Sequence, residues 1–168
     1  MKKVLSLMVA VLLCFVFAGC ADIATNDGGS TATETTTEDT YGLNETAELK
    51  TLKFTATEVK ESDGDDFFTP EDGNVFVGVN FTIENISDEE QSVSSILLFE
   101  AYADDVKCDY SINAQCAFDN GTLDGSIAPG KKMVGWYAIE VPSDWEEIEF
   151  DVQSDWLSSK NARFVFKK

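Results

Sequence analysis

Cys108 and Cys116 are the two residues of this 168-residue chain for which the sequence leaves the fewest chemical roles. The chain has four cysteines, at positions 14, 20, 108 and 116, and it contains no histidine. If the domain is exported, two thiols this close together, with no histidine to complete a zinc site, are most simply a disulfide. The sequence therefore predicts a disulfide between Cys108 and Cys116, and two reduced buried thiols are the alternative.

The lack of histidine also limits catalysis. It removes Ser-His-Asp and Cys-His nucleophilic systems and the histidine-based zinc sites. No glycine-rich phosphate loop is present either. A pair of carboxylates could hydrolyse glycosides, but acidic residues are so abundant that no particular pair is indicated. We therefore expect a protein that is not an enzyme.

One short acidic segment could bind a metal ion. Four carboxylates surround a glycine there, and the candidate ligands are Glu61, Asp63, Asp65 and Asp66. Oxygen ligands at alternate positions suit calcium, but the segment lacks the full spacing of an EF-hand and its terminal glutamate. A solvated acidic turn is the alternative. Apart from this possible calcium ion, no cofactor is expected.

Aromatic side chains offer a second kind of site. Phe67 and Phe68 follow the acidic segment, and with Trp136, Trp145 and Trp156 they could form a platform for a glycan or a peptide. The cores of β-sandwiches use the same residues, so burial is the alternative. Strand alternation places Trp136 opposite Tyr137 and its neighbours, which puts Trp136 outside the main core.

The N-terminal residues predict export and lipidation. Lys2 and Lys3 precede an uncharged apolar stretch from Val4 to Ala18, which is the length of a signal peptide and shorter than a transmembrane helix. The stretch ends in Phe17-Ala18-Gly19-Cys20, which resembles the bacterial lipobox, with phenylalanine in place of the more usual leucine. We expect cleavage before Cys20 and attachment of lipid to its thiol, with a plain signal peptide as the alternative.

Charge excludes one class of partner. The net charge is −19, and removal of Lys2 and Lys3 with the signal peptide lowers it to −21. Such a protein repels phosphate backbones, so nucleic acid is excluded, and repulsion from anionic headgroups predicts that the domain stands away from its membrane. Cations, basic proteins and neutral glycans remain possible partners. Solubility alone would also explain the charge.

Composition divides the chain into three parts. Residues 1–19 are the predicted lipoprotein signal peptide. Residues 20–49 are the lipidated cysteine and an acidic Thr/Ser/Gly segment whose low hydrophobicity predicts a disordered tether. Residues 50–168 have the length of one domain.

Alternation with a period of two predicts an all-β domain from residue 50 onward. The clearest strands are 74–84, which follows a Pro-Glu-Asp-Gly turn, and 133–141, which Pro142 ends. In the first strand, alternation predicts an apolar face of Val75, Val77, Val79, Phe81 and Ile83 and a more polar opposite face. A hairpin is expected from 96–103 and 106–112 across Asp104 and Asp105. Residue Val59 falls out of phase with 52–56, which predicts a β-bulge. Strands at 148–152 and 164–166 complete an antiparallel sandwich of seven or eight strands.

Four motifs in this order are similar to those of a known family. They are Pro70-Glu71-Asp72-Gly73, Val77 to Asn85, Ala128-Pro129-Gly130-Lys131, and Gly135 to Pro142. They resemble the immunoglobulin-like domain of unknown function that is common in secreted lipoproteins of Gram-positive bacteria. That family shares its fold with a mycobacterial secreted immunoprotective antigen. The resemblance implies no active site, and an extracellular binding or adhesion role is what it suggests.

Together these observations predict a lipoprotein on the extracytoplasmic face of the cell membrane. Its immunoglobulin-like domain is expected to act without catalysis as an interaction or adhesion module for an unknown protein or glycan partner. Two alternatives remain at this point. One is a calcium- or small-ligand-binding lipoprotein of a cell-envelope system, and the other is a structural spacer.

Overall fold

The computed structural model describes residues 40–118, 121–157 and 160–168. The predicted signal peptide, Cys20 and residues 21–39 of the predicted tether lie outside the described residues. Within the described residues the fold is the predicted all-β sandwich. It has eleven strands where seven or eight were expected, and five of the eleven are only two or three residues long.

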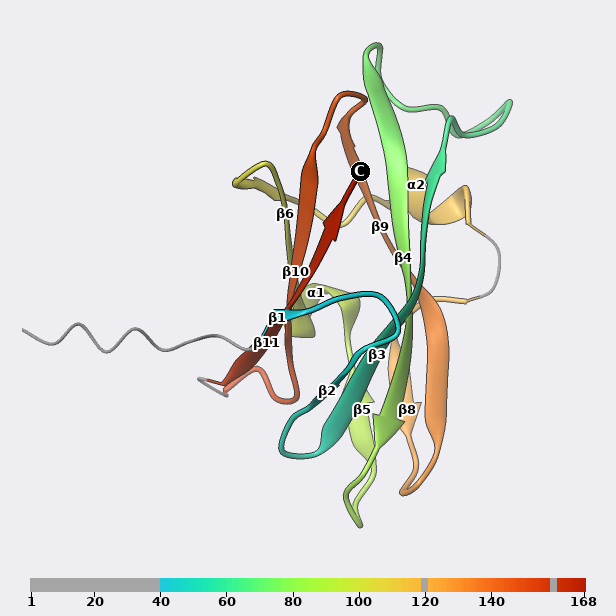
Figure 1. Ribbon diagram of the computed structural model, residues 1–168. Helices are drawn as coiled ribbons and strands as arrows, with labels where there is room; N and C mark the ends of the chain where they lie inside the picture. The colour runs from blue at the N-terminus through green and yellow to red at the C-terminus, as the bar shows by residue number, and fades with distance from the viewer. Residues whose placement is uncertain (1–39, 119–120, 158–159) are drawn as a thin grey trace, which may run out of the picture. The chain divides into compact units, whose positions relative to one another are not determined.

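Two large sheets form the layers of the sandwich (Figure 1). The five-stranded sheet has the order β1 (Thr40–Tyr41), β11 (Asn161–Lys167), β10 (Glu147–Gln153), β6 (Phe99–Ala103) and β7 (Val106–Cys108). The four-stranded sheet has the order β2 (Thr46–Glu48), β3 (Leu52–Ser62), β4 (Asn74–Asn85) and β9 (Lys132–Pro142). A small third sheet pairs β5 (Gln91–Val93) with β8 (Gly125–Ile127). All pairings in the large sheets are antiparallel except that of β1 with β11.

The core between the large sheets is built on aromatic rings. The ring of Phe81 in β4 contacts three other phenylalanine rings, with centroid distances of 5.3 to 5.8 Å and steeply inclined ring planes. These are the rings of Phe99, Phe150 and Phe164. Such edge-to-face contacts favour a single arrangement of the rings as well as burying apolar area. All four rings are less than 5% exposed.

β4 is buried on both of its faces, which corrects the expectation of one apolar and one polar face. Val77, Val79 and Phe81 point into the main core as predicted. Phe76 on the opposite face belongs to a second apolar cluster with Phe118, Ala138, Ala114 and Trp136. Figure 1 shows the short helix α2 (Ile112–Cys116) beside the strands of this sheet, and Ala114 is its contribution to the cluster.

The predicted β-bulge is present in β3. Ala56 pairs with Phe81, and Glu58 pairs with the adjacent Asn80, so Thr57 is the extra residue. The hydroxyl of Thr57 donates to the side-chain oxygen of Asn80 at 2.9 Å. The bulge brings Val59 back to the inner face, where it pairs with Val79 and packs against the core.

The predicted hairpin is confirmed with shorter strands. β6 and β7 pair across Asp104 and Asp105, whose φ angles of 48° and 66° give the left-handed two-residue turn that suits twisted strands. Of the residues expected to extend the two strands, 96–98 and Ile112 belong to short helices, and 109–111 form neither helix nor strand. Ser95–Leu98 is α1, which precedes β6, and α2 follows β7.

The domain begins earlier than the predicted boundary at residue 50. β1 pairs with β11, β2 pairs with β3, and Ala47 and Leu49 are buried in the main core. Residues 40–49 are therefore part of the sandwich and not of the tether. No helix among the described residues is long and apolar enough to cross a membrane.

The sandwich has two distinct ends, which we name after the tryptophans next to β10. The Trp145 end is where β10 begins and where β3, β9 and β11 finish. The Trp156 end is where β10 finishes and where β11 and β6 begin. Thr40, the first described residue, pairs with Arg163 near the start of β11.

Candidate functional site

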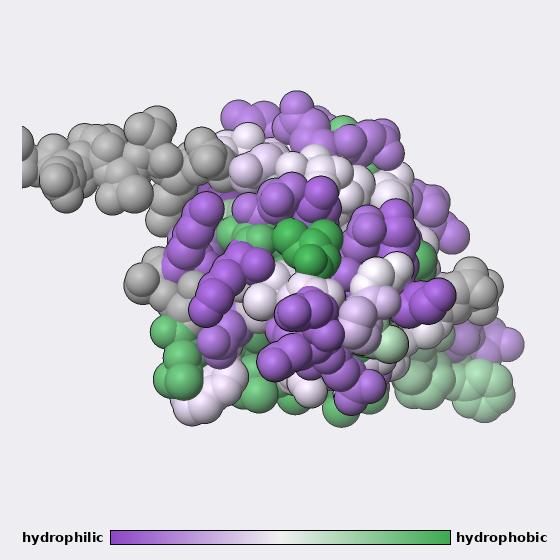
Figure 2. Space-filling view, turned by 90° about the horizontal axis from the view of Figure 1, so that it is seen from below, coloured by the Kyte–Doolittle hydropathy of each residue, from purple (hydrophilic) through white to green (hydrophobic). Residues whose placement is uncertain are grey.

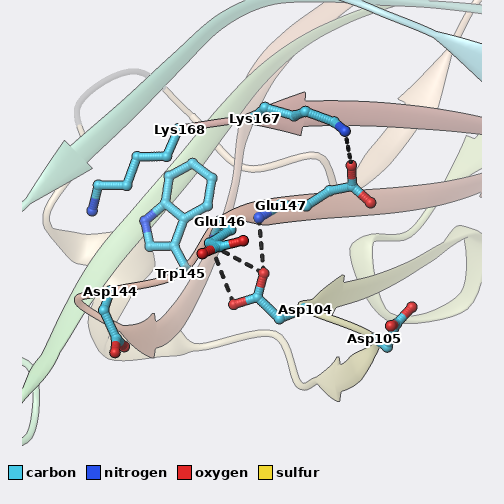
Figure 3. A pocket seen from close by; sticks show the side chains of 8 residues that line it. All are labelled: Asp104, Asp105, Asp144, Trp145, Glu146, Glu147, Lys167 and Lys168. Atoms are coloured by element: carbon cyan, nitrogen blue, oxygen red, sulfur yellow. Dashed lines mark hydrogen bonds and ion pairs between the residues drawn. The ribbon is translucent and has the colours of Figure 1, made fainter.

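A large hollow in the described surface lies at the Trp145 end (Figure 3). It is open to solvent and has a volume of about 930 Å³. Its walls come from the β6–β7 turn, the segment that leads into β10 and the end of β11. Five carboxylates and two lysines line it with Trp145: Asp104, Asp105, Asp144, Glu146, Glu147, Lys167 and Lys168.

Asp104 fixes one wall of the hollow. Its Oδ1 accepts hydrogen bonds from the backbone amides of Glu146 at 3.0 Å and Glu147 at 2.9 Å. Its own amide donates to the carbonyl of Glu147 at 3.0 Å. These bonds tie the turn between β6 and β7 to the start of β10, so the acidic side chains of both segments are held on one rim.

Trp145 forms the floor of the hollow. The indole is buried, and its Nε1 donates to Oε1 of Glu61 at 2.7 Å. The Lys168 ammonium lies 5.2 Å from the centre of the indole ring, in the position of a cation–π contact. The same ammonium is 2.8 Å from Oε1 of Glu61 and donates to the carbonyl of Ser143 at 2.7 Å. Lys168 thus covers the face of Trp145.

These contacts change the acidity of Glu61. The Lys168 ammonium lowers the pKa of the Glu61 carboxyl below its usual range, and the indole N–H lowers it further, while partial burial opposes both. The carboxylate is therefore held in its charged form. Lys167 is similarly engaged, with its ammonium 3.0 Å from Glu147. Asp105, Asp144 and Glu146 remain exposed on the rim, so the hollow presents negative charge to solvent.

The predicted calcium ligands are not brought together. Glu61 is used by Trp145 and Lys168. Asp65 turns back on its own loop, where its Oδ1 accepts from the amides of Phe67 at 2.7 Å and Phe68 at 2.8 Å, and these bonds lower its pKa. Asp63 and Asp66 are exposed. Nowhere in the described ranges do three potential ligand side chains gather for a metal ion, so the calcium prediction is not supported.

The predicted disulfide is absent. Cys108 and Cys116 are both free thiols. Cys108 pairs with Ala101 in the five-stranded sheet, whereas Cys116 ends α2, which packs on β4 and β9 of the other sheet. Proximity in sequence therefore does not place the two sulfurs together. Burial raises the pKa of the half-buried Cys108 thiol, and Cys116 is exposed.

The aromatic residues do not form one platform. Trp145 is buried in the main core, and Trp136 stacks on Phe118 at 5.0 Å in the second cluster. Trp136 thus lies outside the main core, as predicted, but it is not free to bind a ligand. Phe67 is exposed near the Trp145 end, and Trp156 is exposed at the other end.

Sequence reasoning missed most of the hollow. It assigned Asp104 and Asp105 only to a turn, and it attached no role to Lys167 or Lys168. A two-residue acidic turn between strands was the one available signal, and nothing local indicates which loop it will meet.

The sequence of the domain matches a family model over residues 41–163, and the model is described as a domain of unknown function, DUF4352. The chain belongs to this family. The family resemblance predicted from the sequence motifs is thereby confirmed. No curated protein sequence matches the chain.

Solved structures share the fold. A candidate lipoprotein from Bacillus subtilis has a TM-score of 0.60 and 14% identity, over 73% of this chain and 38% of that protein, so the match spans well under half of its length. An uncharacterized β-sandwich protein from Clostridium difficile has a TM-score of 0.52 and 19% identity, over 77% and 93%. The secreted protein MPT63 of Mycobacterium tuberculosis has a TM-score of 0.54 and 11% identity, over 78% and 98%. At these identities the likeness establishes the β-sandwich fold alone.

Proposed function

We propose that the mature protein is an extracytoplasmic lipoprotein, anchored through lipid on Cys20, whose β-sandwich is a non-catalytic interaction module. The lipobox-like residues before Cys20 support the anchor. The structural similarity to a candidate lipoprotein and to a secreted protein supports the location. Residues 1–19 are then the signal peptide, and residues 21–39 connect the lipid to the domain.

The proposal rests on the positions of the chain entry and the acidic hollow along the sandwich. The chain joins the domain at Thr40, which pairs near the start of β11, and the acidic hollow lies where β11 finishes. A domain held from its N-terminal side therefore has its hollow at the far end, available to a partner. Negative charge there attracts a partner that carries cationic groups.

Substitution of Cys20 by serine tests the anchor. The Cys20→Ser protein lacks the thiol that receives lipid, so it is expected to lose the mass of the lipid and to leave the detergent phase on phase partitioning. The wild-type chain should be recovered from the detergent phase with the added mass. Equal mass and equal partitioning of the two proteins would refute the lipoprotein proposal.

Charge variants test the interaction surface. Asp105→Asn, Asp144→Asn and Glu146→Gln together remove three exposed charges from the hollow, and Asp88→Asn, Glu89→Gln and Glu90→Gln remove three from the Trp156 end. The lipidated chain in detergent is titrated with a fluorescent lysine-rich peptide, and anisotropy is measured at low and physiological salt. The first set should weaken binding at least threefold more than the second. Equal losses would mean that only net charge matters.

A further inference from the structure

Large apolar side chains are exposed at the Trp156 end of the sandwich. Trp156 is 66% exposed and Leu157 is 72% exposed, in the turn that follows β10. Leu97 in α1 is 61% exposed, and it lies at the same end because Phe99 of β6, directly after α1, pairs with Val152 near the end of β10. We call Leu97, Trp156 and Leu157 the apolar rim. Grouped exposed apolar residues of this size commonly mark an interaction surface.

Lysine accompanies the apolar rim. Trp156 lines a hollow of about 220 Å³ together with Lys50, Leu98, Gln91 and the exposed Asp155. Lys131 and Lys160 are also exposed at this end, next to the start of β9 and the start of β11. Figure 2 looks at this end and shows hydrophobic side chains in the middle of the face and along its edge, among hydrophilic ones. Tryptophan with neighbouring lysine is the composition found at the interface between a bilayer and water.

The point at which the chain enters the domain indicates what the apolar rim contacts. β1 runs parallel to β11, with Thr40 opposite Arg163 and Tyr41 opposite Phe164, so the chain joins the domain on the side where β11 begins. That is the side of the apolar rim. Residues 21–39 separate Cys20 from Thr40 and can span at most roughly 65 Å when fully extended. A lipid on Cys20 therefore keeps this end at high effective concentration near the bilayer.

We propose that the apolar rim of Leu97, Trp156 and Leu157 contacts the surface of the membrane that holds Cys20, so that the acidic hollow faces away from it. This inference rests on the proposed lipid anchor. It differs from the sequence-based expectation that net charge alone keeps the domain off the membrane. Five carboxylates line the large hollow at the opposite end, whereas the end with the rim carries Lys50, Lys131 and Lys160 beside acidic residues such as Asp88, Glu89 and Glu90.

Tryptophan fluorescence of the lipidated full-length chain tests the contact. The protein is placed in vesicles of phosphatidylcholine and phosphatidylglycerol whose acyl chains carry bromine, which quenches an indole only on close approach. Trp136 and Trp145 are 7% and 3% exposed, so Trp156 is the tryptophan that lipid can reach. We expect quenching in brominated vesicles and its loss in Trp156→Phe. Phe67→Ser, which removes an exposed ring near the other end, should leave the quenching unchanged.

Two outcomes overturn the inference and are distinguishable from failure of the anchor. The mass of the same sample shows whether Cys20 carries lipid. Lipidated protein without quenching of Trp156 refutes the membrane contact and leaves the anchor intact. If Trp156 is unquenched in the vesicles but is shielded from soluble iodide on intact cells, then the rim is a docking site for a protein. Absence of lipid on Cys20 instead refutes the proposed function itself.

Discussion

Asn85 at the end of β4 shows how one side chain can organise several loops. Its Nδ2 donates to the carbonyls of Glu89 and Ile127, each at 2.7 Å, and its Oδ1 accepts from the amide and hydroxyl of Ser87 at 2.9 and 2.8 Å. The residue is fully buried, so each of these bonds replaces a lost bond to water. The sequence indicated only that a strand ends at this asparagine. Ser87 and Glu89 lie in the loop that directly follows Asn85, but Ile127 ends β8, and no local pattern specifies that distant partner.

The two free cysteines give a prediction about single residues. Cys116 is exposed, whereas the Cys108 thiol is half-buried, donates to the carbonyl of Val106 at 3.4 Å and has a pKa raised by burial. Because the thiolate is the reactive form, iodoacetamide should modify Cys116 faster than Cys108 in the native protein at pH 8. Mass spectrometry of peptides from a time course measures both rates. If neither residue reacts until a reductant is added, the cysteines form a disulfide in solution.

Among the elements, the long strands could be predicted and the short ones could not. Alternation predicted strands at 74–84 and 133–141, and the structure has Asn74–Asn85 and Lys132–Pro142. β1 and β2 were assigned to the tether because strands of two and three residues carry no periodic signal and depend on their partners. α1 and α2 have four and five residues, too few to show a helical stripe. Since α2 was missed, the covered face of β4 was expected to be polar.

Gly78 of β4 tests the packing under α2. A Cβ atom at this position would meet the Phe118 ring at 2.9 Å, and Phe118 stacks on Trp136. Gly78→Ala should therefore displace the Phe118 ring, change the near-ultraviolet circular dichroism of Trp136 and cost about 1–3 kcal/mol of unfolding free energy.

Gly42→Ala is the matched control for this substitution. Its new Cβ would meet only the side-chain oxygen of Glu45, at 3.6 Å. Urea midpoints of both variants measure the difference in stability. A Gly78→Ala protein as stable as the control would show that α2 and Phe118 do not pack firmly on the sheet.

For the whole molecule, the distribution of charge matters more than its total. A net charge of −19 predicted repulsion from anionic lipid, yet five carboxylates line the large hollow at one end of β10, whereas the end with the apolar rim carries lysines beside its acidic residues. At 0.1 M, salt screens the interactions between charges that are more than about 10 Å apart. Each end therefore acts on its surroundings largely by its own charges. Composition gives the total, but only the fold determines which charges share an end.

The short strand β1 has a mechanical consequence for a domain held from its N-terminal side. A pulling force on that side acts first on two residue pairs, Thr40 with Arg163 and Tyr41 with Phe164, and on the ring contact of Tyr41 with Phe164 at 5.5 Å. β2 is held more firmly because Ala47 is fully buried. β1 would therefore peel away while the core stays folded. Its release would free residues 40–43, up to the bond of the Asn44 amide to the carbonyl of Ala56, and lengthen the connection by roughly 14 Å, which makes β1 an extensible link that yields before the domain does.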